Sequence, residues 1–252
     1  MEKTDPRYRS FVQILHEELI PAIGCTEPIS LAYGAAKARE VLGREPETVL
    51  VEASGNIIKN VKSVIVPNTG GLKGIEAAAA AGIVAGQPDK ILEVIADVSD
   101  AQKHAIRAYM QTHEIKVKPA ESDVVFDIIL TMTAGSDTVK LRICDYHTNI
   151  VLIQRNGEVL MTSESTSDAG TAAGLTDHGC LTVAGILDFV ETMDVEDVRE
   201  LIERQIEYNY AIAREGMAHS HGANVGKVLK HHYGDDVKFR ARYMAAAGSD
   251  AR

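Results

Sequence analysis

The fold class is decided by one stretch, residues 125–162, which reads VFDIILTMTAGSDTVKLRICDYHTNIVLIQRNGEVLMT. Apolar and polar residues alternate along it with a period of two, which is typical of half-buried β-strands. The predicted strands are residues 125–133, 138–144, 149–154 and 158–162. Their connections are short, and Asn156-Gly157 is a strong signal for a tight hairpin. The stretch therefore predicts an antiparallel β-meander at about residues 123–163.

Outside this stretch the apolar pattern is mostly that of helices. Before it we predict helices at 8–19, 27–42, 75–84 and 100–112, with short strands at 48–53 and 63–66. The small residues inside helix 27–42 predict close packing on its neighbours. After the meander comes a polar segment, 163–179, which we expect to form a lid or an insertion. Further helices are predicted at 181–193, 195–215, 225–232 and 239–247. The fold class is thus α+β, with alanine-rich helices and short strands, then the meander, then a C-terminal helical segment.

Composition narrows the class of partner. Hydrophobic residues make up 45% and charged residues 25% of the 252 residues, as in ordinary globular proteins. The net charge of −10 argues against nucleic acid and against an anionic membrane surface. No apolar run approaches the roughly 18 residues of a membrane span, and the first residues lack the apolar core of a secretory signal. We expect a cytoplasmic protein with no nucleic-acid partner and no membrane partner.

A lone cysteine stands in the run Gly24-Cys25-Thr26-Glu27-Pro28, just before a predicted helix that Thr26 would cap. The helix dipole and the unpaired N–H groups of a first turn lower the pKa of a thiol there. A thiolate can act as a base, a nucleophile or a metal ligand. A core cysteine is the other interpretation, and we favour the functional one because Gly24 allows close backbone approach and Glu27 adds a carboxylate.

The two remaining cysteines, Cys144 and Cys180, are interpreted as small buried apolar residues. With no CxxC spacing, the three cysteines predict neither a disulfide framework nor a zinc knuckle. His219 and His221 are metal-ligand residue types, and together with Cys180 they give a third hypothesis, a zinc hydrolase. Because the spacing of the histidines matches no metal motif, no metal ligand is predicted in this chain.

Small polar residues follow the strand predicted at 48–53. Ser54 and Asn56 can hydrogen-bond a carboxylate, Lys59 can neutralise it, and Asn60 lies close by in sequence. The alternative interpretation is that these residues only form a capped turn and bind no ligand. The glycine-rich loop at 68–74 could hold an anion at the start of a helix, or could simply begin that helix. His147, in a strand connection, could face a site.

These segments together resemble a known family. They are residues 24–32 (GCTEPISLA), Asn56, Lys59-Asn60, Val66-Pro67 with Thr69-Gly70, residues 147–151 (HTNIV) and residues 249–252 (SDAR). In this order, and across essentially the whole chain, they resemble the L-cysteine desulfidase family, which is related to the iron–sulfur L-serine dehydratases. The resemblance implies elimination of sulfide from L-cysteine to give pyruvate and ammonia. It implies that Cys25 removes the α-proton, and that a [4Fe–4S] cluster held by three cysteines binds the substrate through an open iron.

The resemblance also sets expectations for what lies beyond this chain. Family members continue well past the segment at 249–252, and the cluster ligands lie in that continuation. The chain is therefore expected to be the N-terminal portion, 1–252, of a desulfidase-like unit, with no cluster bound to it alone. It would be a shortened chain, a split subunit or a decayed gene product, completed by a C-terminal region or subunit.

The substrate is expected to be a small amino acid, L-cysteine or L-serine, bound by Ser54, Asn56, Lys59 and Asn60. We also expect a homo-oligomer. The alternative hypothesis is an inactive or regulatory amino-acid-binding module built from the same residues.

Overall fold

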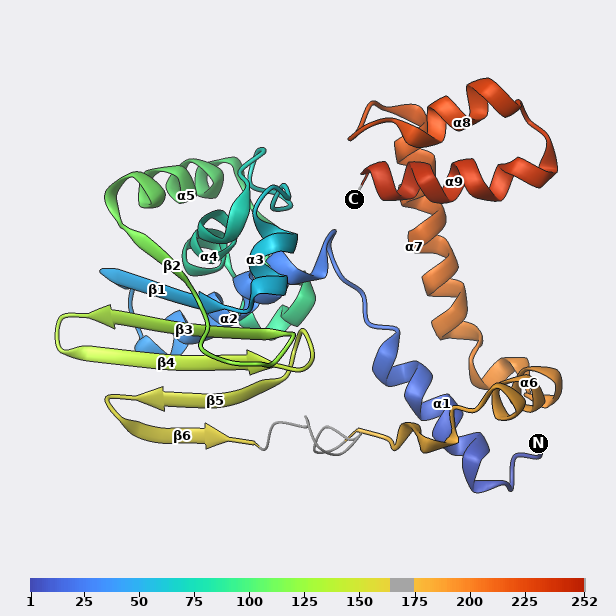
Figure 1. The fold of residues 1–252 in the computed structure, drawn as a ribbon, viewed down its shortest axis with the longest axis horizontal. Helices are drawn as coiled ribbons and strands as arrows, with labels where there is room; N and C mark the ends of the chain where they lie inside the picture. The colour runs from blue at the N-terminus through green and yellow to red at the C-terminus, as the bar shows by residue number, and fades with distance from the viewer. Residues whose placement is uncertain (164–174, 252) are drawn as a thin grey trace. The chain divides into compact units, whose positions relative to one another are not determined.

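The computed structural model describes residues 1–163 and 175–251 and forms two compact units (Figure 1). The first, Pro21–Leu175, is called the sheet unit below. The second combines Met1–Ile20 with Thr176–Arg252 and is called the helical unit. Sheet and helices are both substantial, so the predicted α+β class is confirmed. The meander and the C-terminal helices belong to different units.

The sheet unit is built on one mixed sheet. Its strands are β1 (Thr48–Ala53), β2 (Ile115–Pro119), β3 (Asp127–Ala134), β4 (Asp137–Cys144), β5 (Ile150–Arg155) and β6 (Glu158–Thr162). They lie in the order β2-β1-β3-β4-β5-β6 (Figure 1). Strands β3 to β6 are the predicted antiparallel meander, which is confirmed. β1 continues the sheet beside β3, and β2 joins β1 in parallel.

Helices cover the sheet and form the core with it. They are α2 (Thr26–Leu42), α3 (Gly55–Val61), α4 (Gly74–Ala85), the 3-10 helix η1 (Pro88–Glu93) and α5 (Asp100–Thr112). α2 packs on β3, β4 and β5, and α4 packs on both α2 and α5. Alternate residues of β3, such as Leu130, are fully buried. A Cβ added to Gly34 of α2 would lie 2.8 Å from the Leu130 side chain, so helix and strand are in close contact.

Small residues bring α2 and α4 together. A Cβ built at Gly82 would overlap the carbonyl oxygen of Ala32, and one at Gly86 would meet the Ala36 methyl group at 2.6 Å. Two helix backbones approach this closely only when no side chain stands between them. The close packing predicted for the helix at 27–42 is therefore confirmed.

Three local predictions in this unit are wrong. Cys25 itself is the N-cap of α2, and Thr26 is the first helical residue. The turn expected at Ser54 is the start of α3, because the Ser54 hydroxyl caps a short helix there. The strand expected at 63–66 is reduced to a single bridge between Ile65 and Lys73, because the chain turns back on itself between them.

The helical unit has a small aromatic core. Its elements are α1 (Pro6–Glu18), η2 (His178–Cys180), α6 (Val183–Thr192), η3 (Val195–Asp197), α7 (Arg199–Ala218), α8 (Val225–Tyr233) and α9 (Val237–Ala251). Phe189 of α6 stacks on Phe11 of α1, with ring centroids 4.9 Å apart, and meets Tyr8 edge-on at 5.2 Å. α8 and α9 pack side by side, and α9 packs on α7 (Figure 1).

Among the described residues, no helix combines the length and the apolar character that crossing a membrane would require.

Candidate functional site

Cys25 lies at the N-terminal end of α2 in an extended conformation, with φ −69° and ψ 128°. Its side chain is half-buried and makes no capping hydrogen bond to the helix. Gly24 before it has φ +68°, a conformation that favours glycine, which explains the glycine in the run. The first-turn N–H groups of α2 therefore have no side-chain oxygen to satisfy them. An anion at this position would meet both free donors and the positive end of the helix.

Glu27, two residues after the thiol, forms a polar pair with Asn60 of α3. Glu27 lies in the first turn of α2, and Asn60 Nδ2 donates a hydrogen bond to its Oε1 at 3.3 Å. The Thr26 hydroxyl lies 3.5 Å from the other carboxylate oxygen. α3 therefore brings one of the predicted substrate-binding residues to the helix end that carries Cys25.

His147 is the third polar group at this end of α2. The Ser30 hydroxyl donates to the carbonyl oxygen of His147 at 2.6 Å, which ties the β4–β5 connection to α2. The imidazole meets the Phe126 ring edge-on, with centroids 4.6 Å apart. Burial lowers the pKa of His147 below its usual 6.5, and the negative charge of Glu27 acts in the opposite direction. At neutral pH the imidazole of His147 is therefore held in its neutral form, at the same helix end as the side chains of Cys25, Glu27 and Asn60.

The other predicted substrate-binding residues have different surroundings. Ser54 is buried; its hydroxyl donates to the carbonyl oxygen of Val125 at 2.7 Å and accepts from the Ile57 N–H at 3.3 Å. Its hydrogen bonds are thus used to cap α3. Asn56 and Lys59 are exposed on α3. In the described part of the chain, no hydrogen bond or ion pair links them to Asn60 or Glu27.

Polar side chains of the glycine-rich loop at 68–74 donate hydrogen bonds to backbone carbonyl oxygens of the same unit. The Asn68 amide donates to the carbonyl oxygens of Ile95 and Ala96 at 3.0 and 2.9 Å. The Thr69 hydroxyl donates to the carbonyl oxygen of Val66 at 2.7 Å. Because these polar groups fasten the loop to its neighbours, the loop is explained as the start of α4. The segment predicted to form a lid lies largely at 164–174, outside the described residues.

The cysteines do not form a cluster site. Cys144 is fully buried at the end of β4, as predicted, and Cys180 is half-buried beside the aromatic core of the helical unit. Cys25 and Cys144 belong to the sheet unit and Cys180 to the helical unit. Because Cys144 is fully buried in the sheet unit and no cysteines are grouped as metal ligands among the described residues, this donor set does not fit a [4Fe–4S] cluster held by this chain alone. His219 and His221 do come together, but their third neighbour is Glu215 and not Cys180.

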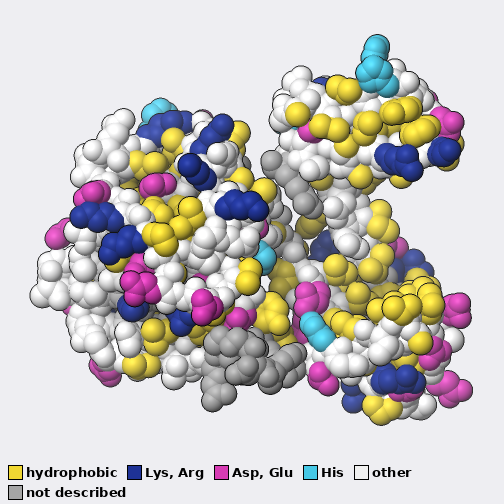
Figure 2. Space-filling view, in the orientation of Figure 1, with side chains coloured by type: hydrophobic (Ala, Val, Ile, Leu, Met, Phe, Trp, Pro, Cys, Tyr) yellow, Lys and Arg dark blue, Asp and Glu magenta, His cyan; other side chains and the backbone are white. Residues whose placement is uncertain are grey.

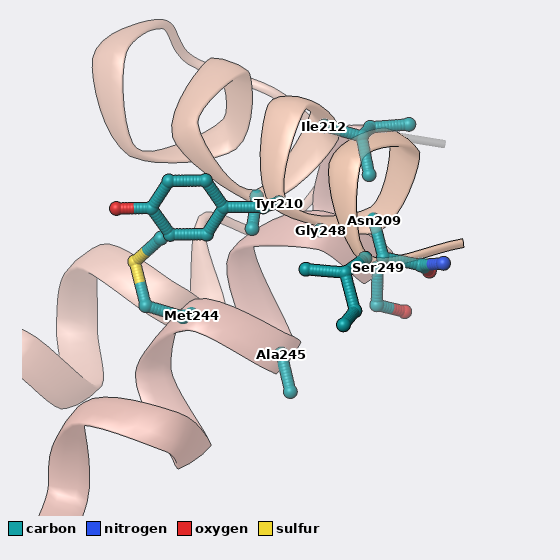
Figure 3. Close-up of a pocket in the computed structure, with 9 residues that line it drawn as sticks. Asn209, Tyr210, Ile212, Met244, Ala245, Gly248 and Ser249 are labelled. Atoms are coloured by element: carbon teal, nitrogen blue, oxygen red, sulfur yellow. The ribbon is translucent and has the colours of Figure 1, made fainter. Parts of the chain in front are cut away.

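A pocket that was not predicted from the sequence lies in the helical unit. It has a volume of about 520 Å³ and lies between α7 and α9 (Figure 3). Tyr210 and Met244 stand next to each other at one side, and Asn209 and Ser249 lie on the other (Figure 3). The sequence feature that could have indicated this pocket is a pair of large apolar residues on α7, Ile206 and Tyr210, which are one helical turn apart. Both are about 60% exposed.

The fold and the site define an α+β protein with a half-buried thiol at a helix start and a carboxylate in the first turn of that helix. Known proteins similar to this chain are UPF0597 proteins. The one from Desulfitobacterium hafniense (strain Y51) is 58% identical over 252 residues, covering 100% of this chain and 58% of the relative. That from Lachnoclostridium phytofermentans is 45% identical over 97% of this chain and 58% of the relative. That from Shewanella oneidensis is 33% identical over 98% of this chain and 59% of the relative.

These comparisons correct the expected family. The relatives that match the whole chain carry the name UPF0597, so the assignment to the L-cysteine desulfidase family, as its N-terminal portion, is wrong. Their names describe no reaction, ligand or partner. This chain spans less than two thirds of the length of these relatives. No family model matches the chain. No solved structure matches it either.

Proposed function

We propose that Cys25 is the proton-abstracting base of an enzyme that eliminates the β-substituent of a small amino acid. L-cysteine is the first candidate substrate and L-serine the second. One observation carries the proposal. A half-buried thiol stands at an uncapped helix start, two residues before Glu27, whose carboxylate accepts a hydrogen bond from Asn60. A reactive thiolate needs both access and a positive local field, and this position combines them. Cys25 and Cys180 are free thiols, which fits a reducing compartment, so we place the enzyme in the cytoplasm.

The reaction follows from the groups present. The Cys25 thiolate takes the proton from Cα, and the electron pair of that bond forms a double bond to Cβ. The bond from Cβ to sulfur breaks, and hydrosulfide leaves with its electron pair. The aminoacrylate that remains tautomerises to an imine, which water hydrolyses to pyruvate and ammonia. Glu27 would accept a hydrogen bond from the substrate ammonium group, and Asn60 would donate one to its carboxylate.

The loss of sulfide is assisted by whatever stabilises the leaving negative charge. The iron–sulfur cluster expected from the sequence would supply a metal ion for this purpose. Because the three cysteines of this chain do not fit a cluster, we assign that part of the reaction to a region or subunit beyond this chain. The residues described here then bind the amino acid and move its α-proton.

Proton exchange at Cα tests the proposal without the rest of the enzyme. The chain is incubated with L-cysteine, L-serine or L-alanine in D2O, and the Cα signal is followed by NMR. We expect wild-type chain to exchange this proton, and Cys25→Ala to lose roughly 100-fold or more of the rate, as for removal of a general base. Cys180→Ala is the matched control, because it also removes a half-buried thiol. Exchange that persists in Cys25→Ala would exclude the proposed base.

The same experiment separates the alternative, a regulatory amino-acid-binding module. Such a module binds L-cysteine or L-serine in calorimetry but exchanges no Cα proton. We expect Asn60→Ala and Glu27→Ala to weaken binding under both hypotheses. Binding without exchange in the wild-type chain would support the module and contradict the lyase.

We further propose that the helical unit packs against the remainder of the longer protein. Its apolar residues lie on outward helix faces, as at Val183, Leu187 and Val190 of α6, which are all more than half exposed. Figure 2 shows apolar side chains gathered over the helices of this unit. The pocket between α7 and α9 opens on the same unit. Apolar patches left exposed on a protein surface commonly mark sites where another protein segment binds.

The occupant we commit to is the part of the relatives that this chain does not match, about 42% of their length. A second copy of this chain is the other outcome. Hydrogen exchange of α6 and α7, with and without that part of the Desulfitobacterium hafniense relative, distinguishes the two. Slower exchange only in its presence supports the proposal. Exchange that slows with the concentration of this chain alone supports self-association.

A further inference from the structure

The C-terminal end of α7 gathers three metal-ligand side chains. Glu215 and His219 are four residues apart, so they lie on the same face of the last turn. α7 ends at Ala218, and the chain then turns so that His221 reaches back to the same carboxylate. Glu215 Oε1 lies 2.9 Å from His219 Nδ1 and 2.9 Å from His221 Nε2. One oxygen thus sits between two imidazole nitrogens.

We propose that Glu215, His219 and His221 form a zinc-binding site with an open coordination position at the end of α7. The proposal is independent of the function assigned to Cys25. Zinc takes imidazole nitrogen at about 2.0 Å and carboxylate oxygen at about 2.0–2.2 Å in tetrahedral geometry, which puts its ligands roughly 3.3 Å from one another. The three ligand atoms here lie within 4.8 Å of one another. Small rotations of exposed side chains are enough to reach the tetrahedral spacing.

The loop after α7 holds His221 in place. The Asn224 side-chain oxygen accepts from the His221 N–H at 3.3 Å, and the Asn224 N–H donates to the His221 carbonyl oxygen at 3.0 Å. Gly222 and Asn224 both adopt positive φ, at 51° and 54°, which closes this turn. Groups that fix the position of a ligand contribute to metal affinity. The end of α7 therefore positions His219, and the turn that follows positions His221.

The charges around the three side chains affect how favourably a cation would bind there. The last carbonyl groups of a helix carry partial negative charge and favour a cation. Lys227 acts against the metal by charge, since its ammonium group donates to the His219 carbonyl oxygen at 2.5 Å. With three protein ligands and solvent exposure, the fourth position would hold water, as in exchangeable or catalytic zinc sites.

Calorimetry with zinc chloride tests the site in the full chain after removal of metals with chelator. We expect one zinc ion per chain, and affinity reduced about tenfold or more in Glu215→Gln, His219→Gln and His221→Gln, since even outer-shell losses cost 10–100-fold. The matched control is His231→Gln with His232→Gln. These are two exposed neighbouring histidines on α8, with ring centroids 5.4 Å apart.

Cobalt provides a second measurement. Co²⁺ bound by two imidazoles, a carboxylate and water should give visible bands typical of four-coordination, without a thiolate charge-transfer band. A thiolate band would show that Cys25 or Cys180 binds the metal, and would overturn the proposal. Equal zinc affinity in wild type and His221→Gln would overturn it as well. So would a loss in the α8 control as large as in His221→Gln.

Discussion

At the scale of single residues, two helix N-caps show how the side chain determines whether the first-turn N–H groups of a helix are satisfied. The Ser54 oxygen accepts the Ile57 N–H and also donates, so it completes the start of α3. The Cys25 sulfur stands at the equivalent point of α2 and makes no capping bond. Sulfur is a weak acceptor, so the first-turn donors of α2 are not satisfied by the residue that precedes them. A serine at position 25 would cap the helix and remove the thiol at the same time.

His147 makes an acid-sensitive contribution to stability. Burial holds its folded pKa below the usual 6.5, so around and below pH 6.5 the unfolded chain binds more protons than the folded chain. Stability from this residue therefore falls as the pH drops through about 6.5. We expect urea unfolding at pH 7.5 and pH 5.5 to differ less in His147→Gln than in wild type.

Glu27→Gln should increase the same acid sensitivity, because the Glu27 charge partly offsets the lowering of the His147 pKa. His104→Gln is the control, since His104 is an exposed histidine on α5 of the same unit. An unchanged difference between the two pH values in His147→Gln would contradict the assignment.

At the scale of elements, the contact between α2 and α4 depends on the absence of side chains. Gly82→Ala places a Cβ against the Ala32 carbonyl group, and the two helices must move apart. Overpacking of this kind costs about 1–3 kcal/mol of unfolding free energy. Urea denaturation measures it. Gly55→Ala is the control, because a Cβ there meets nothing within 4 Å. Equal stability of Gly82→Ala and wild type would show that the helices are less closely packed than described.

Elements with a clear period or a clear cap could be predicted from the sequence. The alternation along 125–162 predicted all four strands of the meander. The helix predicted at 100–112 begins with a clear local signal, since Ser99 caps α5 and Gln102 completes a capping box. β2 was missed although its residues alternate with lysines as in an edge strand, because the run is only five residues long and ends in Pro119. α3 could not be found either, since a helix of seven residues carries almost no periodic signal.

The candidate site was predictable only in part, because some of its contacts join elements that are distant in sequence. A lone cysteine at a helix start can be found in a sequence, because the helix boundary and the cysteine are local features. The pairing of Glu27 with Asn60 depends on how α3 packs on α2, which lies beyond local pattern. The same holds for Glu215, which joins His219 and His221 only because the chain turns back after α7.

At the scale of the whole molecule, the two units differ in how much core each contains. The sheet unit has a continuous core that runs from α2 and α4 through β1, β3, β4 and β5. In the described part of the helical unit, the aromatic cluster consists of Tyr8, Phe11, Phe189 and Val198. Because apolar burial is the main stabilising term, the helical unit on its own should be the less stable part of the chain.

Hydrogen exchange measures this difference and the contribution of the rest of the protein. We expect amides of α6 and α7 to exchange faster than those of β3 and β4 in the chain alone. Phe189→Ala should raise exchange in the helices and leave the strands unchanged, and Leu130→Ala should do the reverse, since each removes a buried side chain from one core. Under the proposed docking, adding the unmatched part of the Desulfitobacterium hafniense relative should slow exchange in α6 and α7, because it would cover the exposed Leu187 and Val190. Leu187→Asp should abolish that protection while leaving the exchange of β3 and β4 as in wild type. Protection of the strands instead of the helices would mean that the remainder of the protein docks on the sheet unit, and the assignment of the helical face would then be wrong.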